Sequence, residues 1–209
     1  MVTTPRQTAG VMRRAESLAG RGGFPLATWG GFVREFLRNP RTVGAVAPSS
    51  SVLARAIVEA LPAHVSTVVE LGPGTGSITG ELLAHASCTG RVVALEIDER
   101  FCGHLVTRFR DGRLAVLNRP AEELTQVVSE LGVPVDAVVT SLPLSNFPAA
   151  VRNLIVEGMH EVVRPGGVVV GFSYMPHVVP RVMRERFGNC TTRLVWQNVP
   201  PAFVFRSVR

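Results

Sequence analysis

The chain has 209 residues, of which 46% are apolar and 18% charged, and its formal net charge is +6. This composition excludes an intrinsically disordered chain, because enough apolar side chains are present to form a core, and the length fits one domain with an extension. All 22 basic residues are arginine, which excludes chemistry that needs a lysine Schiff base or a P-loop lysine.

Cysteines and histidines predict no disulfide framework and no metal site. The three cysteines are widely spaced and form no CxxC pair, and the five histidines lack ligand spacing. No apolar run reaches the roughly 18 residues that span a bilayer, and the first residues lack the apolar segment of a signal peptide. We therefore expect a cytoplasmic protein with reduced thiols.

Residues 1–45 are predicted to form a basic extension. Seven arginines stand against two acidic residues in this part of the chain. Apolar side chains recur at helical spacing beside Arg34 and Arg38, namely Leu26, Trp29, Phe32, Val33, Phe36 and Leu37. Such a helix favours an anionic membrane surface, and thus a peripheral position at the inner face of the membrane. A lid helix on the core, a nucleic-acid contact and a solvated tail are the alternatives.

Residues 46–209 are predicted to form one domain in which strands alternate with helices. The strand runs are residues 66–71, 91–96, 113–118, 136–142, 167–173, 191–197 and 202–208, and the helical runs are 76–86, 98–109, 121–131, 147–162 and 180–187. This alternation predicts an α/β fold with a doubly wound, mostly parallel sheet of seven strands. Only "NVPP" separates the last two strands, which must therefore pair as an antiparallel hairpin. Asp98, Ser129 and Gly166 stand where caps or turns are expected.

The stretch "VVELGPGTGSIT", residues 68–79, forms a glycine-rich turn after the first strand. Its glycines are Gly72, Gly74 and Gly76. Ligands of parallel sheets bind beyond the carboxyl ends of the strands, and glycine lets the backbone approach them closely. The dinucleotide pattern GxGxxG is missing, because Ser77 or Thr79 stands at its sixth position, counted from Gly72 or Gly74.

Two carboxylates flank this turn in the predicted fold. Glu70, two residues before Gly72, would repel a pyrophosphate but attract a cation. S-adenosylmethionine carries an ammonium and a sulfonium group and no phosphate, so it fits this arrangement. Glu96 ends the second strand, where an acidic side chain can accept both hydroxyls of a ribose, as it also does in NAD sites.

The pattern "ELGPGTGSIT", then "LEID", then a proline-containing turn after the fourth strand resembles the class I methyltransferases over residues 36–209. The resemblance implies a Rossmann-like fold and S-adenosylmethionine as cofactor. By this resemblance the cofactor is held by Glu70, Gly72, Gly74, Gly76, Ser77, Glu96, Ile97, Ala121, Glu122 and Ser141. Many relatives have an acidic residue where Pro120 stands, so Glu122 or the backbone at Ala121 is expected to contact adenine instead.

Within this class the sequence looks like rRNA adenine dimethyltransferases and bacterial phospholipid N-methyltransferases. Adenine enzymes carry an aromatic residue that stacks on the base where "SLPLSNFP", residues 141–148, has Leu144. Phe147 would compensate only in an unusual loop. The rRNA enzymes add a C-terminal helical domain, which is not expected after the hairpin here. "FLRNPRTVGAVAPSS" and "NVPPAFVFR" also resemble the phospholipid enzymes.

The resemblance implies that a lipid amine attacks the sulfonium methyl group in line, converting phosphatidylethanolamine toward phosphatidylcholine. The lipid ammonium must first lose a proton. Catalytic candidates follow the fourth and fifth strands: Ser141, Asn146, Tyr174 and His177. An rRNA adenine or small-molecule methyltransferase on the same fold, and a regulatory protein that binds the cofactor without transferring a methyl group, are the alternatives.

Overall fold

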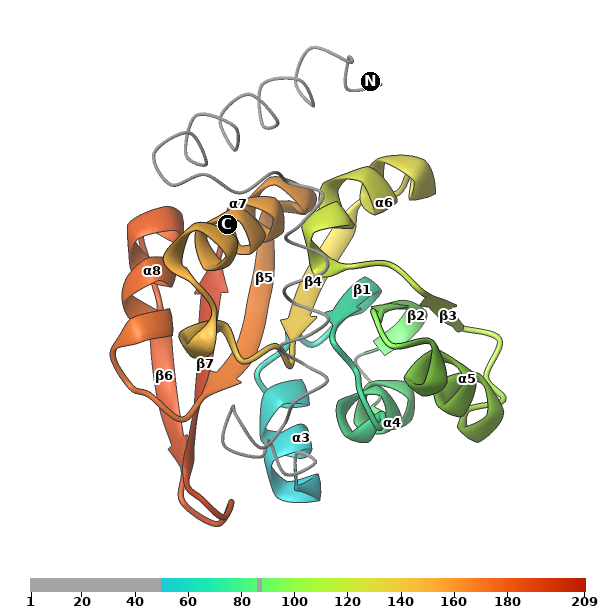
Figure 1. Ribbon diagram of the computed structural model, residues 1–209, viewed down its shortest axis with the longest axis horizontal. Helices are drawn as coiled ribbons and strands as arrows, with labels where there is room; N and C mark the ends of the chain where they lie inside the picture. The colour runs from blue at the N-terminus through green and yellow to red at the C-terminus, as the bar shows by residue number, and fades with distance from the viewer. Residues whose placement is uncertain (1–49, 86–87) are drawn as a thin grey trace.

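A computed structural model describes residues 50–85 and 88–209 (Figure 1). The predicted basic extension, with its amphipathic helix, lies outside the described residues. The strands are β1 (Val65–Leu71), β2 (Cys88–Leu95), β3 (Leu114–Leu117), β4 (Val135–Thr140), β5 (Val163–Ser173), β6 (Thr191–Val195) and β7 (Ala202–Val208). The helices are α3 (Ser51–Val58), α4 (Ser77–Ala84), α5 (Glu99–Arg108), α6 (Leu124–Leu131), α7 (Ala149–Val162) and α8 (Val178–Phe187), with 3-10 turns η1 (Ala121–Glu123) and η2 (Leu144–Asn146).

The seven strands form one sheet in the order β3-β2-β1-β4-β5-β7-β6. Strands β1 to β5 are parallel, while β7 runs antiparallel to both β5 and β6. The β6–β7 hairpin places Val195 opposite Ala202. The predicted doubly wound sheet and its closing hairpin are therefore confirmed.

Two apolar clusters cover the two faces of the sheet. Helices α3 and α4 pack on one face, and α6, α7 and α8 pack on the other. Adjacent β1 residues enter different clusters, because Val68 points toward α3 and α4 while Val69 points toward the opposite layer. Central strands buried on both faces need continuous apolar runs, which explains the valine-rich strand sequences.

Four local features bear on the sequence prediction. Helix α3 was not predicted; Ser50 caps it by accepting the backbone N–H of Leu53 at 3.2 Å. Asp98 caps α5 as predicted, by accepting the N–H of Arg100. Ser129 lies inside α6, whose end is instead made by Gly132 in a left-handed conformation. Gly166 has a φ of 79° in the irregular start of β5.

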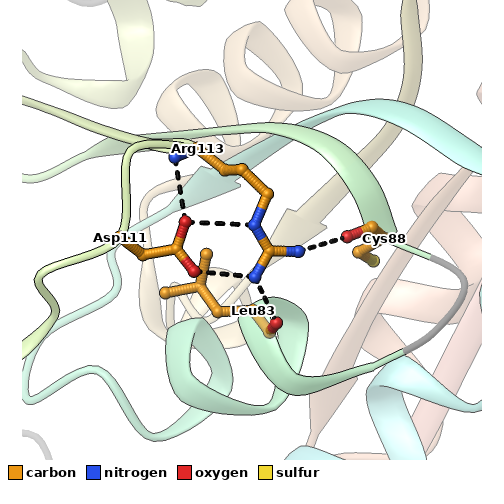
Figure 2. A network of polar contacts seen from close by, with 4 residues as sticks. All are labelled: Leu83, Cys88, Asp111 and Arg113. Carbon is orange, nitrogen blue, oxygen red and sulfur yellow. Dashed lines mark hydrogen bonds and ion pairs between the residues drawn. The ribbon is translucent and has the colours of Figure 1, made fainter.

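A polar network fixes the amino end of β2 and β3 (Figure 2). The Arg113 guanidinium pairs with the Asp111 carboxylate at 2.7 Å and donates to the carbonyls of Cys88 at 2.9 Å and Leu83 at 2.6 Å. The hydrogen bonds from Arg113 lower the pKa of Asp111 to about 2. One side chain thus joins the end of α4 to the starts of two strands.

A second polar contact fixes the amino end of β1 and β4. The Asp136 carboxylate accepts the N–H groups of Ser66 and Thr67 at 2.8 and 2.9 Å and pairs with Arg164.

No helix in the described part of the chain is long and apolar enough to cross a bilayer.

We expect Gly171→Ala to destabilise the sheet. A Cβ at Gly171 would lie 2.6 Å from side-chain carbons of Thr140 and Phe205, so the strands must separate. We expect the free energy of unfolding in urea to fall by about 1–3 kcal/mol. The control is Gly103→Ala in α5, where a Cβ meets nothing within 4 Å and should stabilise the helix by up to about 1 kcal/mol. Equal effects in the two variants would contradict this packing.

Candidate active site

Backbone hydrogen bonds bring the carboxyl ends of four neighbouring strands together. The Glu96 N–H donates to Leu117, the Gly72 N–H to Leu95, and the Ser141 N–H to Leu71, at 2.9 to 3.0 Å. These contacts extend the pairing of β3, β2, β1 and β4 just beyond the strand ends. The glycine turn, Glu96 and Ser141 consequently lie along one edge of the sheet, where parallel sheets bind their ligands.

The three glycines of the turn serve different purposes. All have positive φ, at 68°, 55° and 82°. A Cβ at Gly72 would lie 2.6 Å from Leu142, and one at Gly76 would lie 2.5 Å from Phe109. A Cβ at Gly74, by contrast, would meet no protein atom within 4 Å. Packing therefore requires Gly72 and Gly76, whereas Gly74 leaves its outer side free for a ligand.

The amides of these glycines are already used within the protein. Gly72 donates to the Leu95 carbonyl, Gly76 donates to the Pro73 carbonyl at 2.9 Å, and Gly74 donates to the Glu96 carboxylate at 3.0 Å. Phosphate cradles need several free N–H groups that point at the anion. A turn that directs its central amide at a carboxylate is therefore unsuited to a phosphate.

Glu70 lies beneath the turn and is fully buried. Its Oε2 accepts the Thr79 hydroxyl at 2.7 Å, and its Oε1 has no hydrogen-bond partner among the described residues. Burial raises the pKa of Glu70 to about 7, because the charged form is poorly solvated there. The carboxylate is thus placed to attract a cation on the other side of the turn by electrostatic attraction, without direct contact. Sequence reasoning missed Thr79, which stands within the quoted motif.

Glu96 connects the turn to the end of β2. Glu96 is 5% exposed. Its Oε2 accepts the Gly74 N–H, and its Oε1 accepts the Asp98 N–H at 2.9 Å. Burial raises its pKa. Each carboxylate oxygen can accept a further hydrogen bond, as two ribose hydroxyls would require. Asn118, another residue missed in the sequence, donates to the Glu96 carbonyl at 2.9 Å, and Ile97 follows half-buried.

The turn after β3 contains a second shielded carboxylate. Ala121 is buried at the start of η1, and both carboxylate oxygens of Glu122 are shielded and have no partner among the described residues. Burial raises the pKa of Glu122. An acceptor without a donor is costly inside a protein, and the exocyclic amine of adenine is a suitable donor. Glu70, Glu96 and Glu122 therefore fit an adenosine ligand that carries a positive charge.

The four catalytic candidates lie on two separate turns. Ser141 and Asn146 follow β4, with Asn146 exposed at the end of η2. Tyr174 and His177 follow β5; Tyr174 is half-buried and makes a T-shaped contact with Phe172 at 5.6 Å between ring centroids, and His177 is exposed at the start of α8. The sheet order makes these turns neighbours, since β4 and β5 pair directly.

Leu144 and Phe147 both turn into the core. They are 2% and 3% exposed and belong to the cluster on the α6–α8 face. The turn 141–148 thus offers no exposed aromatic ring on which a base could stack. Within residues 50–85 and 88–209, no group of three or more His, Cys, Asp or Glu side chains could hold a metal ion.

Similarity to known proteins agrees with this geometry. A family described as "Methyltransferase domain" matches residues 68–167. The chain is 32% identical to an ornithine lipid N-methyltransferase of Singulisphaera acidiphila over 82% of this chain and 91% of that protein. It is also 32% identical to a ribosomal RNA small subunit methyltransferase A of Moorella thermoacetica, over 68% of this chain but only 64% of that protein.

A solved structure supports the fold. The 1,6-didemethyltoxoflavin-N1-methyltransferase of Burkholderia thailandensis, which holds bound S-adenosylhomocysteine, superposes with a TM-score of 0.63 at 16% identity. The match covers 100% of this chain and 92% of that chain. At this identity the likeness concerns the fold alone.

We expect the affinity for S-adenosylmethionine to depend on the ionisation of Glu70. A bound cation favours the carboxylate, whereas the free site with a pKa of about 7 is increasingly protonated as the pH falls. Binding measured by calorimetry should weaken about tenfold between pH 7.5 and pH 5.5. In Glu70→Gln the affinity should be lower at pH 7.5 and lose this dependence. An unchanged profile in the variant would contradict the role of Glu70.

We also expect Glu70→Gln to stabilise the free protein at high pH. The pKa of Glu70 is raised from 4.5 to about 7, so its carboxyl destabilises the fold increasingly as the pH rises from 4.5 to 7. At pH 8 the free energy of unfolding of the variant should be about 1–3 kcal/mol higher than that of the wild type. Near pH 4 this difference should vanish. The glutamine oxygen can still accept from Thr79. A variant less stable than the wild type at pH 8 would contradict this explanation.

Two matched glycine variants test the free side of the turn. Gly74 and Gly132 both have positive φ, and a Cβ meets no protein atom within 4 Å at either position. Gly74→Ala and Gly132→Ala should therefore lose similar stability, about 1–2 kcal/mol. Only Gly74→Ala should also bind S-adenosylmethionine more weakly, by about tenfold or more, which corresponds to about 1.4 kcal/mol. Equal affinities would show that the ligand does not lie against Gly74.

Proposed function

Because the chain belongs to the class I S-adenosylmethionine-dependent methyltransferases, we propose that it N-methylates the primary amine of a lipid headgroup. The enzyme class and its cofactor, S-adenosylmethionine, follow from the family. The acceptor does not, because this fold serves many acceptors. It must be argued from the turns that follow β4 and β5.

The observation that carries the proposal is the burial of Leu144 and Phe147 in the turn after β4. The adenine methyltransferases that the sequence resembles stack the flipped base on an aromatic ring at this turn, and both candidate side chains here are part of the core. A flexible aliphatic amine needs no stacking platform. The similarity to a lipid N-methyltransferase along 91% of that protein supports the same choice, whereas the rRNA methyltransferase is matched over only 64% of its length.

Bound S-adenosylmethionine supplies a methyl group on a positively charged sulfur, ready for direct displacement. The chain's own contribution is to position the two reactants and to remove water. With the cofactor bound, Glu70 would stabilise positive charge from beneath the turn, Glu96 would accept the ribose hydroxyls, and Glu122 or the backbone at Ala121 would contact the adenine. In this proposal Gly72, Gly74, Gly76, Ser77 and Ile97 would form the remaining wall of the cofactor site, and Ser141 would border it on the β4 side.

The acceptor amine must reach the site without its proton. Partial burial favours the neutral amine, and the oxygens of Ser141 and Asn146 can accept its remaining hydrogens. As the new bond forms, positive charge returns to the nitrogen. The face of the Tyr174 ring is suited to stabilise that charge, so its effect is on the transition state rather than on the ground state. His177, exposed at the start of α8, is the candidate proton relay.

Two acceptors share the chemistry that this site requires. Phosphatidylethanolamine and ornithine lipid both present a primary amine at the membrane surface. Phosphatidylethanolamine follows from the resemblance to phospholipid N-methyltransferases, and ornithine lipid follows from the lipid that the relative's name states. Both fit a peripheral enzyme that works on lipid in an anionic membrane, and the test must offer both.

We expect labelled S-adenosylmethionine to transfer its methyl group to lipid. Vesicles with phosphatidylethanolamine, vesicles with ornithine lipid and total RNA should be tested separately. Tyr174→Leu should lower kcat by about threefold to thirtyfold, since a cation-π contact contributes roughly 0.5–2 kcal/mol, and should leave the Kd of S-adenosylmethionine unchanged. Tyr174→Phe is the control, because it keeps the ring. Label in RNA and not in either lipid would refute the proposal.

A further inference from the structure

Large exposed apolar side chains gather at one side of the carboxyl edge. Of seven such side chains in the described residues, five come from α3 and from the segments that follow β5 and border the β6–β7 turn. Val199 is 86% and Trp196 69% exposed. We call these five the apolar rim: Val52, Met175, Leu194, Trp196 and Val199. Scattered exposed apolar residues are ordinary, but a cluster indicates a contact surface.

Hydrogen bonds hold the start of α3 against the β6–β7 turn, which brings Val52 close to the part of the rim in that hairpin. The Ser50 hydroxyl, which caps α3, donates to Asn198 Oδ1 at 2.5 Å and ties the start of the helix to the β6–β7 turn. The Asn198 amide in turn donates to the Pro200 carbonyl at 2.6 Å. Val52, Leu194 and Trp196 line one groove of about 450 Å³ between α3 and β6, whose far part is lined by Arg55 and by the Arg193–Glu59 ion pair. Figure 1 shows the hairpin turn extending at the lower left, beyond the ends of the neighbouring strands.

The apolar rim lies on the acceptor side of the site. Strand β7 pairs with β5 so that Phe203 lies opposite Ser173, which places the turn 196–201 just beyond the carboxyl end of β5. Met175 leaves that same strand end, next to Tyr174. An acceptor that approaches the turns after β4 and β5 therefore passes this surface.

Four segments near the apolar rim and the turns after β4 and β5 are free of formal charge, unlike the part of the same edge that carries Glu96, Asp98 and Glu122. Residues 50–54, 141–151, 173–180 and 194–205 contain no Asp, Glu or Arg, although charged residues make up 18% of the chain. Arginines flank these segments, namely Arg55, Arg152, Arg181, Arg193 and Arg206, and three of them pair with glutamates of the protein, Glu81, Glu185 and Glu59. Surfaces that face only water are usually charged. Neutral segments with exposed tryptophan and valine, followed by arginine, are typical of protein parts that enter the interfacial layer of a bilayer.

We propose that the apolar rim inserts into the interfacial layer of a phospholipid bilayer and presents the acceptor side of the site to the headgroups. This inference rests on the proposed function, because it assumes that the acceptor is a lipid. It adds a membrane contact within the methyltransferase domain, separate from the basic extension of residues 1–45. Tryptophan suits this position, because its ring prefers the boundary between the acyl chains and water.

Tryptophan fluorescence tests the insertion without any methyl transfer. The chain has two tryptophans, so Trp29→Phe leaves Trp196 as the only reporter. Vesicles of phosphatidylethanolamine and phosphatidylglycerol, without S-adenosylmethionine, should shift its emission to shorter wavelength, and lipids brominated near the headgroup end of the acyl chains should quench it. Emission that stays at the position of water-exposed tryptophan while the protein sediments with the vesicles would overturn the proposal, as would failure to sediment.

A matched pair of charge substitutions locates the contact. In the same background, Val199→Asp should lower the vesicle partition coefficient about fivefold or more, because an apolar contact is replaced by a charge. Val106→Asp, at a valine of α5 that is 60% exposed and outside the rim, should leave it unchanged. Thermal midpoints of both variants confirm folding. Equal loss in the two variants would overturn the proposal. A shift that depends on protein concentration without vesicles would do so too, by assigning the rim to self-association.

The two proposals fail in different ways. If Trp196 enters the bilayer but no lipid is methylated, the surface stands and the proposed acceptor falls. If lipid is methylated in detergent micelles while Trp196 remains in water on vesicles, the proposed function stands and the membrane contact of the rim falls.

Discussion

A fully buried carboxylate beneath a glycine turn is the constraint on which the site depends. Thr79 is the hydrogen-bonding residue of Glu70, whose Oε1 has no partner among the described residues, and burial raises the pKa of Glu70 to about 7. In the free protein this arrangement costs stability whenever the carboxyl ionises. A cation over the turn offsets that cost, and an anion would increase it. The use of the Gly74 amide by Glu96 leads to the same conclusion, because it leaves the turn better suited to a positively charged ligand than to a phosphate.

The polar groups at the two edges of the sheet differ in whether they have partners within the protein. At the amino edge, Arg113 donates to backbone carbonyls of α4 and β2, and Asp136 accepts backbone N–H groups of β1. At the carboxyl edge, the carboxylates of Glu70 and Glu122 keep oxygens without protein donors. Unpaired buried acceptors are costly in a part that only supports the fold. Their concentration where parallel strands end indicates groups that await ligand donors, and the amino-edge contacts give the sheet the rigidity to hold them in place.

Sequence patterns predicted the fold because each element carries its own signal. Valine-rich runs predict buried parallel strands, and the short link "NVPP" allows only a hairpin. Glu70 and Glu96 could be found because they stand at fixed positions relative to the glycines. The contacts of Gly72 with Leu142 and of Gly76 with Phe109 join residues far apart in the chain, so no local pattern predicts them. No local pattern predicts the apolar rim for the same reason, since only the tertiary fold brings α3 beside the β6–β7 turn.

The most direct test of a cation site built on Glu70 is to measure the pKa of that side chain. NMR can follow its titration in protein labelled with ¹³C at the glutamate carboxyl carbons. The resonance lost in Glu70→Gln identifies the group. In the free protein it should titrate with a pKa near 7, and saturating S-adenosylmethionine should lower that pKa by at least about one unit. A pKa that stays the same or rises when the cofactor binds would contradict the account.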